Sequence, residues 1–148
     1  MKYLKKIQAD LIIAMKSKDK VKMRTLRSML SKLKLKKIEL KEDLSENQEI
    51  YVINKELKNR KESFTTYSDA GRNDLAKEEK EEMDIIKTYL PKELDESKII
   101  EIVKEVIKET GAGTIKDMGK VMKPVMEKVA GRADGKIVQT IVKKELGN

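Results

Sequence analysis

Two Gly-Lys pairs, at residues 119–120 and 135–136, come closest in this sequence to a phosphate-binding loop. Such a loop follows a strand and has the pattern G-x-x-x-x-G-K-[ST], because backbone N–H groups wrap the phosphate and the hydroxyl binds Mg²⁺. Gly113 precedes the first pair by six positions rather than five, and Val121 and Ile137 stand where a hydroxyl is needed. No strand pattern comes before either pair. The sequence therefore excludes a nucleotide loop of this kind.

Side chains that commonly perform catalysis or bind zinc are missing from the chain. It contains no Cys and no His, which excludes disulfides, thiol nucleophiles, imidazole bases and the common zinc sites. Carboxylates are frequent in "KEEKEEMD" (residues 77–84), but such a run on a charged helix indicates a solvated face. We predict no catalytic residue, no cofactor and no metal site.

Basic residues gather between the two Gly-Lys pairs, in a segment that reads as a helix–turn–helix pair. They are Lys120, Lys123, Lys128, Arg132 and Lys136. A helix that begins after "GRADG" would add backbone donors suited to a phosphate. The chain has one Phe, four Tyr and no Trp, so stacking on single-stranded bases is poorly supported, and the backbone and shape of a folded RNA fit better. The alternative is a solvated face with no ligand.

A second basic face is predicted on the helix that ends near residue 40. Its members are Lys20, Arg24, Arg27, Lys34 and Lys41. Residues 1–41 contain 14 Lys or Arg against three acidic residues, a net charge of +11, whereas residues 42–90 carry −5 and residues 91–148 carry +2. Concentration in one segment favours a surface that faces a polyanion, although an excess of lysine also serves solubility alone.

Apolar residues recur at helical spacing through almost the whole chain, and no segment reads as a strand. Ser45 with Gln48 forms a capping-box pattern, Asn73, Asp95, Thr114 and Asp134 are predicted N-caps, and Pro91 ends the fourth helix. We expect an all-α, multihelical protein with an N-terminal four-helix bundle (1–91) and a small C-terminal three-helix domain (92–148). No apolar run approaches the roughly 20 residues of a membrane span, and we expect a cytoplasmic protein.

Four segments in this order resemble the GatB/YqeY family. They are "LRSMLSKLKLKKIE", "ELKNRKESFTTYSDAGRNDLAKEEKEEMDIIKTYLPKEL", "DMGKVM" and "VAGRADGKIVQTIVKKEL". The resemblance is to the free-standing YqeY-like proteins, whose last part is similar to the tail of the B subunit of the glutamyl/aspartyl-tRNA amidotransferase. It implies two all-α domains and a C-terminal part that contacts tRNA. The matched tail positions are Gly119, Lys120, Gly131, Arg132, Ala133 and Asp134.

The family label also implies carbon–nitrogen ligation with glutamine as the amido-N-donor. This chain has no Cys nucleophile, no amidase-type Ser-Ser-Lys signature and no nucleotide loop, so we do not expect that activity from the chain alone. We predict a non-catalytic accessory that binds tRNA or another structured RNA. The alternatives are a component of tRNA transamidation, and a helical adapter for a protein partner that uses Leu35 and the acidic central helices. The glycines and Asp134 have the further alternative that they only cap helices.

Pro124 departs from the family pattern, in which a proline often stands near the position of Glu127. A proline inside a helix costs on the order of 3 kcal/mol unless the helix breaks or restarts there. We therefore expect the helix after Thr114 to kink about Lys120 or to split.

Overall fold

The structure, a computed structural model, describes residues 1–147, which form seven α-helices and one 3₁₀ turn and contain no strand. The helices are α1 (Lys2–Ser17), α2 (Lys20–Leu40), α3 (Glu46–Asp69), α4 (Asn73–Lys87), α5 (Glu96–Thr110), α6 (Met118–Val129) and α7 (Gly135–Gly147), and the turn η1 (Ile115–Asp117) precedes α6. The predicted all-α, multihelical fold class is confirmed.

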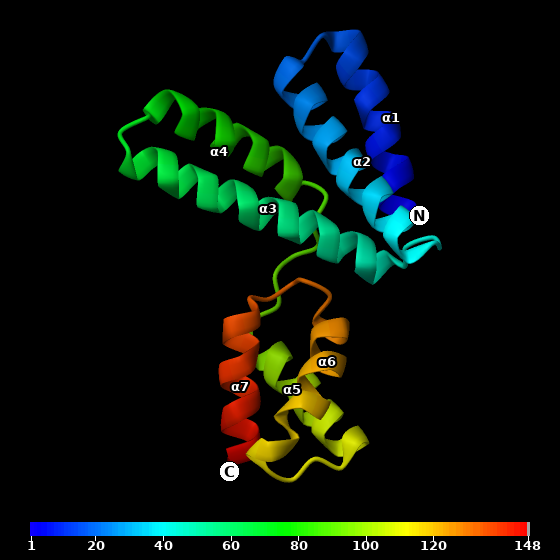
Figure 1. Cartoon of the computed structure of the whole chain (residues 1–148), viewed down its shortest axis with the longest axis vertical. Coiled ribbons are helices and arrows are strands. Elements are labelled where there is room, and N and C mark those ends of the chain that lie inside the picture. The colour runs from blue at the N-terminus through cyan, green and yellow to red at the C-terminus, as the bar shows by residue number, and fades with distance from the viewer. Residues whose placement is uncertain (148) are drawn as a thin grey trace. The chain divides into compact units, whose positions relative to one another are not determined.

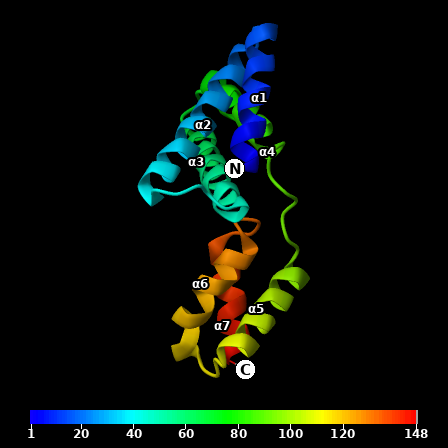
Figure 2. The same ribbon diagram turned by 90° about the vertical axis from the view of Figure 1, so that its right-hand side faces the viewer.

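The chain divides into two compact units, Met1–Leu90 and a second unit that begins at Pro91. In the first unit α1 packs along α2, and α3 packs along α4 (Figures 1 and 2). In the second unit α5, α6 and α7 pack against one another. Each unit has a hydrophobic core of its own.

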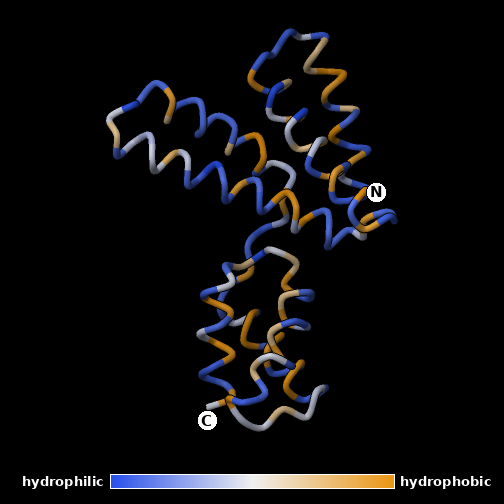
Figure 3. The backbone as a smooth tube through the Cα atoms, viewed as in Figure 1, coloured by the Kyte–Doolittle hydropathy of each residue, from blue (hydrophilic) through white to orange (hydrophobic). Residues whose placement is uncertain are grey.

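Hydrophobic residues recur along the helices of both units, as the colouring of the backbone shows (Figure 3), and many of their side chains are buried. The core of the first unit includes Ile7, Leu26, Leu33, Ile53 and Ile86. The core of the second unit is built from Ile99, Val103, Val106, Val121, Val125, Val129, Val138, Ile141, Val142 and Leu146. The 3.6-residue repeat places these residues on one side of each helix, and their burial supplies the main stabilisation.

Side-chain caps define several helix starts. Ser45 accepts a hydrogen bond from the Gln48 N–H (3.2 Å) while the Gln48 side chain accepts from the Ser45 N–H (2.8 Å), which is the predicted capping box. Asp95 accepts from the Lys98 N–H (2.9 Å) at the start of α5, also as predicted. The prediction for α4 is wrong by one residue: Asn73 is the first helical residue, and Arg72 is the N-cap.

The helix that contains Pro124 does not kink or split at Lys120. α6 runs without interruption from Met118 to Val129, and the change of geometry falls earlier, at the 3₁₀ turn η1. Pro124 removes one backbone donor, but Val121 and Val125 of the same helix are fully buried. Their burial offsets the lost hydrogen bond, so the helix continues.

Candidate nucleic-acid interface

The turn between α6 and α7 brings the predicted tail motif together. Ala130 (φ 51°) and Gly131 (φ 74°) both lie in the left-handed region, and the Ala130 N–H donates to the Met126 carbonyl (3.0 Å) to end α6. Glycine has no Cβ penalty in this conformation, so Gly131 shapes the turn. Gly131 has a structural reason for its place here that needs no ligand.

Arg132 points back onto the end of α6. Its Nε donates to the Val129 carbonyl (3.1 Å) and its Nη2 donates to the Lys128 carbonyl (3.1 Å). The Arg132 carbonyl in turn accepts from the Leu94 N–H (2.9 Å), which ties the segment before α5 to this turn. The half-buried side chain thus adds donors to carbonyls at the end of α6, and the Val129 carbonyl also accepts from the Arg132 N–H (3.0 Å).

Asp134 and Lys136 open α7. The Asp134 carboxylate accepts from the Lys136 N–H (2.8 Å), and the Asp134 carbonyl accepts from the Val138 N–H (3.1 Å). Ala133, between turn and helix, is packed against the core of the second unit. The Lys136 side chain is exposed and makes no ion pair with residues 1–147.

Lys128 is held by α5. Its Nζ lies 3.0 Å from the Glu105 carboxylate and 3.2 Å from that of Glu109, and these hydrogen bonds raise the pKa of Lys128. The hydrogen bond from Lys128 likewise lowers the pKa of the Glu105 carboxyl. A phosphate that binds Lys128 would have to compete with two carboxylates.

The remaining predicted site residues on α6 face solvent. Gly119, Lys120 and Lys123 are all exposed, and Lys123 makes no ion pair within the described residues. The Lys120 Nζ lies 3.9 Å from Asp117, whose carboxylate accepts instead from the N–H groups of Gly113 (3.0 Å) and Thr114 (3.3 Å). Those backbone donors lower the pKa of Asp117. Lys120 and Lys123 are therefore available to a ligand.

The outer face of α7 carries two further lysines that sequence reasoning missed. Lys136, Lys143 and Lys144, which we call the α7 basic face, are exposed and make no ion pair among residues 1–147. Val138 and Val142 lie on the opposite, buried side of the helix. The signal in the sequence was the spacing i, i+7 and i+8 from Lys136, which returns to one side of a helix.

Charge within the second unit is uneven. Residues 91–114, which include α5, contain four basic and six acidic residues, whereas residues 115–147 contain eight basic and four acidic residues. Among the residues that the structure describes, the exposed lysines of α6 and α7 thus stand apart from the mixed charges of α5.

The second predicted basic face lies on α2. Lys20, Arg24, Arg27, Lys34 and Lys41 are all exposed. Arg24 differs from the other four residues because its Nε donates to the buried Glu82 carboxylate at 2.7 Å. The other four make no ion pair within residues 1–147.

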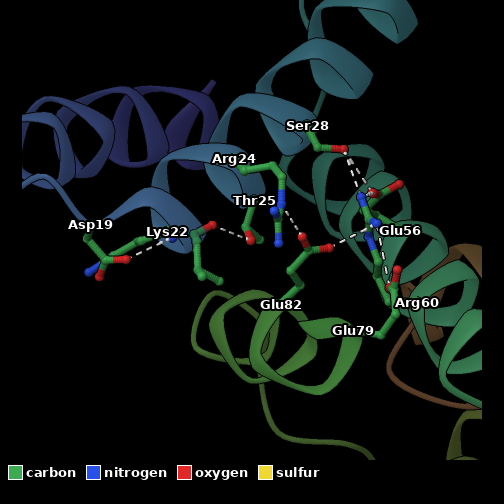
Figure 4. A network of polar contacts seen from close by, with 10 residues as sticks. Asp19, Lys22, Arg24, Thr25, Ser28, Glu56, Arg60, Glu79 and Glu82 are labelled. Atoms are coloured by element: carbon green, nitrogen blue, oxygen red, sulfur yellow. Dashed lines mark hydrogen bonds and ion pairs between the residues drawn. The ribbon is translucent and has the colours of Figure 1, made fainter. Parts of the chain in front are cut away.

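A buried ionic network, absent from the sequence predictions, joins α2, α3 and α4 (Figure 4). The Arg60 guanidinium lies 3.0 Å from Glu56, 2.9 Å from Glu82 and 3.6 Å from Glu79. Glu56 also accepts from the Ser28 hydroxyl at 3.0 Å. The prediction that "KEEKEEMD" forms a solvated face is therefore wrong for Glu82, whose side chain is only 4% exposed.

Burial and charge act in opposite directions on this network. Burial lowers the pKa of Arg60, but the Glu82, Glu56 and Glu79 carboxylates outweigh it and the pKa is raised. Burial raises the pKa of the Glu79 carboxyl above its usual value, and Arg60 offsets only part of that rise. Because the carboxylates are engaged by arginine and lie between helices, the network serves packing and offers no open site for a ligand.

Among residues 1–147, no group of three or more acidic side chains is arranged to hold a metal ion. No helix there is both long enough and apolar enough to cross a membrane.

The four sequence segments that resemble the GatB/YqeY family all lie within a longer match to a family model. A family model described as "Yqey-like protein" matches residues 4–146. The chain belongs to the YqeY-like protein family. The family recognised from the four sequence segments is thereby confirmed.

The YqeY-like chain also matches curated fungal proteins named "Altered inheritance of mitochondria protein 41, mitochondrial". The protein of Vanderwaltozyma polyspora is 33% identical over 120 residues, which cover 76% of this chain and 64% of the relative. That of Saccharomyces cerevisiae is 39% identical over 85 residues (57% and 46%), and that of Pyrenophora tritici-repentis is 29% identical over 149 residues (97% and 81%). The chain thus spans less than two thirds of the length of the first two.

The mitochondrial names of these relatives correct one prediction. They contradict the expectation of a cytoplasmic protein, which was wrong. That expectation rested on the lack of a long apolar run, which does not distinguish the cytosol from the interior of an organelle.

Proposed function

We propose that this protein binds tRNA or another structured RNA, without catalysing a reaction, through the exposed lysines of α6 and α7. The observation that supports the proposal is the α7 basic face, where Lys136, Lys143 and Lys144 have no acidic partner among residues 1–147. Lys120 and Lys123 on α6 add two exposed cations. The 3.9 Å contact of Lys120 with Asp117 is the one ion pair that these five lysines make among residues 1–147. Exposed lysines without a close acidic partner can neutralise phosphates and release their counterions.

A folded RNA suits this surface better than an unpaired strand. The five aromatic residues of the chain, Tyr3, Tyr51, Phe64, Tyr67 and Tyr89, all precede residue 91, so the second unit has no ring on which a base can stack. Stacking supplies roughly 1–3 kcal/mol per base in single-strand binders. Contacts to phosphates and to the shape of a duplex need no aromatic side chain.

The spacing of the lysines also fits the sugar–phosphate backbone of an RNA strand. Lys136 and Lys143 are seven residues apart, which is about 10.5 Å along a helix at a rise of about 1.5 Å per residue. Long, flexible lysine side chains at that separation reach successive phosphate groups along one strand. No reaction is assigned, because the chain lacks Cys and His, and its buried carboxylates are bound by arginines or, at Glu49, by backbone N–H groups.

The bonds of Lys128 and Arg132 assign these two residues a supporting role in the proposal. Lys128 joins α6 to α5, and Arg132 closes the end of α6. They hold the two helices that present the lysines. Gly131, Ala133 and Asp134 shape the turn between those helices in the same way.

The test is fluorescence anisotropy of labelled bulk tRNA with a triple variant, Lys136→Ala/Lys143→Ala/Lys144→Ala. We expect binding about 10- to 100-fold weaker at moderate salt, since three phosphate contacts are removed. The matched control is Lys92→Ala/Lys104→Ala/Lys108→Ala, which removes the same charge from exposed positions in and before α5. Equal losses in both variants would show that net charge alone is measured, and would contradict the proposed site.

A further inference from the structure

The outer face of α2 carries a regular row of cations. Lys20, Arg27, Lys34 and Lys41, which we call the α2 stripe, recur every seven residues and are all exposed. Seven residues are nearly two turns, so the four lie along one side, about 10.5 Å apart. The buried residues Leu26, Met29 and Leu33 lie on the opposite side of the helix.

The acidic residues of the first 41 positions are already engaged elsewhere. Asp10 accepts from the Tyr89 hydroxyl (2.5 Å), Asp19 caps α2 by accepting from the Lys22 N–H (3.1 Å), and Glu39 pairs with Lys36 (3.0 Å). These three are all the acidic residues in a segment with 14 basic ones.

Carboxylates from outside this segment bind other cations and leave the α2 stripe free. Glu46 pairs with Lys2 at 3.1 Å, Glu82 with Arg24 at 2.7 Å, and Asp43 with Lys37 at 2.6 Å. None of the four stripe side chains makes an ion pair with residues 1–147. Their charge is therefore directed to solvent or to a ligand.

The C-terminal end of the stripe is concave. Lys34 and Lys41 line an open depression of about 560 Å³ together with Lys37, Ile38, Glu42 and Asp43. Asp43 binds Lys37, so these two charges cancel, and Glu42 remains as one acidic side chain beside Lys34 and Lys41. The depression gives two unpaired lysines a shared space that a phosphate and its sugar can enter.

We infer that the α2 stripe is a second phosphate-contacting surface for structured RNA. The inference rests on the proposed function and adds an RNA contact in the first unit. Charge complementarity identifies the ligand. Four regularly spaced cations over about 31 Å match a polyanion whose charges are also regularly spaced.

An anionic membrane surface fits the stripe less well. Helices that lie in a membrane interface pair a basic face with a broad apolar face. On α2 most of the apolar face is buried in the core, and the exposed large apolar side chains of this helix are Leu35, Ile38 and Leu40.

The experiment compares three variants of the full chain on labelled bulk tRNA over a range of salt. The stripe variant is Lys20→Gln/Arg27→Gln/Lys34→Gln, which spares Arg24 because Arg24 binds Glu82. The charge-matched control is Lys55→Gln/Lys58→Gln/Lys77→Gln, at exposed positions of α3 and α4. The third is the α7 variant described above. Circular dichroism verifies that all retain their helix content.

We expect the stripe variant to bind about 10- to 100-fold more weakly than the parent, with a salt slope smaller by about 2 to 3, while the control changes little. A stripe variant that binds like the control overturns the inference, and the proposed function then stands or falls with the α7 variant alone. Sedimentation with phosphatidylserine vesicles completes the test. Vesicle binding that depends on the stripe, with RNA binding unchanged, would also overturn the inference, in favour of a lipid surface.

Discussion

In the first unit three glutamates, Glu49, Glu56 and Glu82, lie buried between the helices, whereas every buried core residue described in the second unit is apolar. Glu49 accepts hydrogen bonds from the N–H groups of Tyr3 and Leu4 at the start of α1. Glu56 and Glu82 bind Arg60. The second unit instead interlocks β-branched side chains, seven of them valines.

The two designs have different consequences for the surface. In the first unit, acidic side chains of α3 and α4 are drawn inside, where they bind Arg60, Arg24 and the start of α1. Apart from Arg24, the exposed cations of α1 and α2 are therefore little neutralised by them. In the second unit no buried charge was found among the described residues, and the excess of lysine on α6 and α7 faces outward. A basic surface thus arises in two ways in one chain.

The largest expected effect comes from removing the centre of the ionic network. Glu82→Ala leaves Arg24 without its partner and removes one carboxylate from Arg60, and breaking a buried pair typically costs about 3–5 kcal/mol. Urea unfolding followed by tyrosine fluorescence measures this, because all four tyrosines lie in the first unit. Glu81→Ala, its exposed neighbour, is the control. Equal stability of the two variants would mean that the network does not hold this unit.

A smaller loss is expected from the aliphatic core. Val125→Ala removes two fully buried methyl groups and leaves a cavity, at a cost of about 2 kcal/mol. Hydrogen exchange measured by mass spectrometry should become faster in α6 and α7, while the tyrosine transition of the first unit stays in place. Ile137→Ala, on the exposed side of α7, serves as the control. A tyrosine transition that shifts by the full amount would contradict the separation of the two cores.

The smallest effect concerns pH. Because burial raises the pKa of Glu79 in the folded state, its ionisation opposes folding. That cost is fully present above the folded pKa and disappears as the pH falls toward the unfolded value of about 4.3.

We therefore expect Glu79→Gln to be more stable than the parent at pH 7 by a few tenths of a kcal/mol, with the gain absent near pH 4. Tyrosine-detected urea unfolding at both pH values measures it, with the exposed Glu78→Gln as control. A Glu79→Gln variant that is clearly less stable at pH 7 would show that Arg60 outweighs burial.

The helices could be predicted because their signals are local. The apolar repeat and the caps Ser45 and Asp95 each depend on residues within one or two turns. The start of α6 was not predicted because the capping pattern at Thr114 opens the 3₁₀ turn η1, which leads directly into α6.

The polar interior was missed for a different reason. Glu49, Ile53, Glu56 and Arg60 follow a spacing of three or four residues, so they share one side of α3, and this was the available signal. Their partners, however, come from α1, α2 and α4, and only tertiary packing brings those helices to them. The same holds for Lys128, whose carboxylates on α5 lie 19 and 23 positions away.

The central claim, that unpaired lysines of the second unit bind structured RNA, is tested most directly by the salt dependence of tRNA binding. Association constants for the parent chain and for Lys136→Ala/Lys143→Ala/Lys144→Ala would be measured by anisotropy over a range of salt, with competing duplex DNA of equal phosphate content. The account predicts that tRNA resists the competitor in the parent and that the variant lowers the slope of log K against log salt by about 2 to 3. An unchanged slope in the variant, or equal competition by DNA, would contradict it.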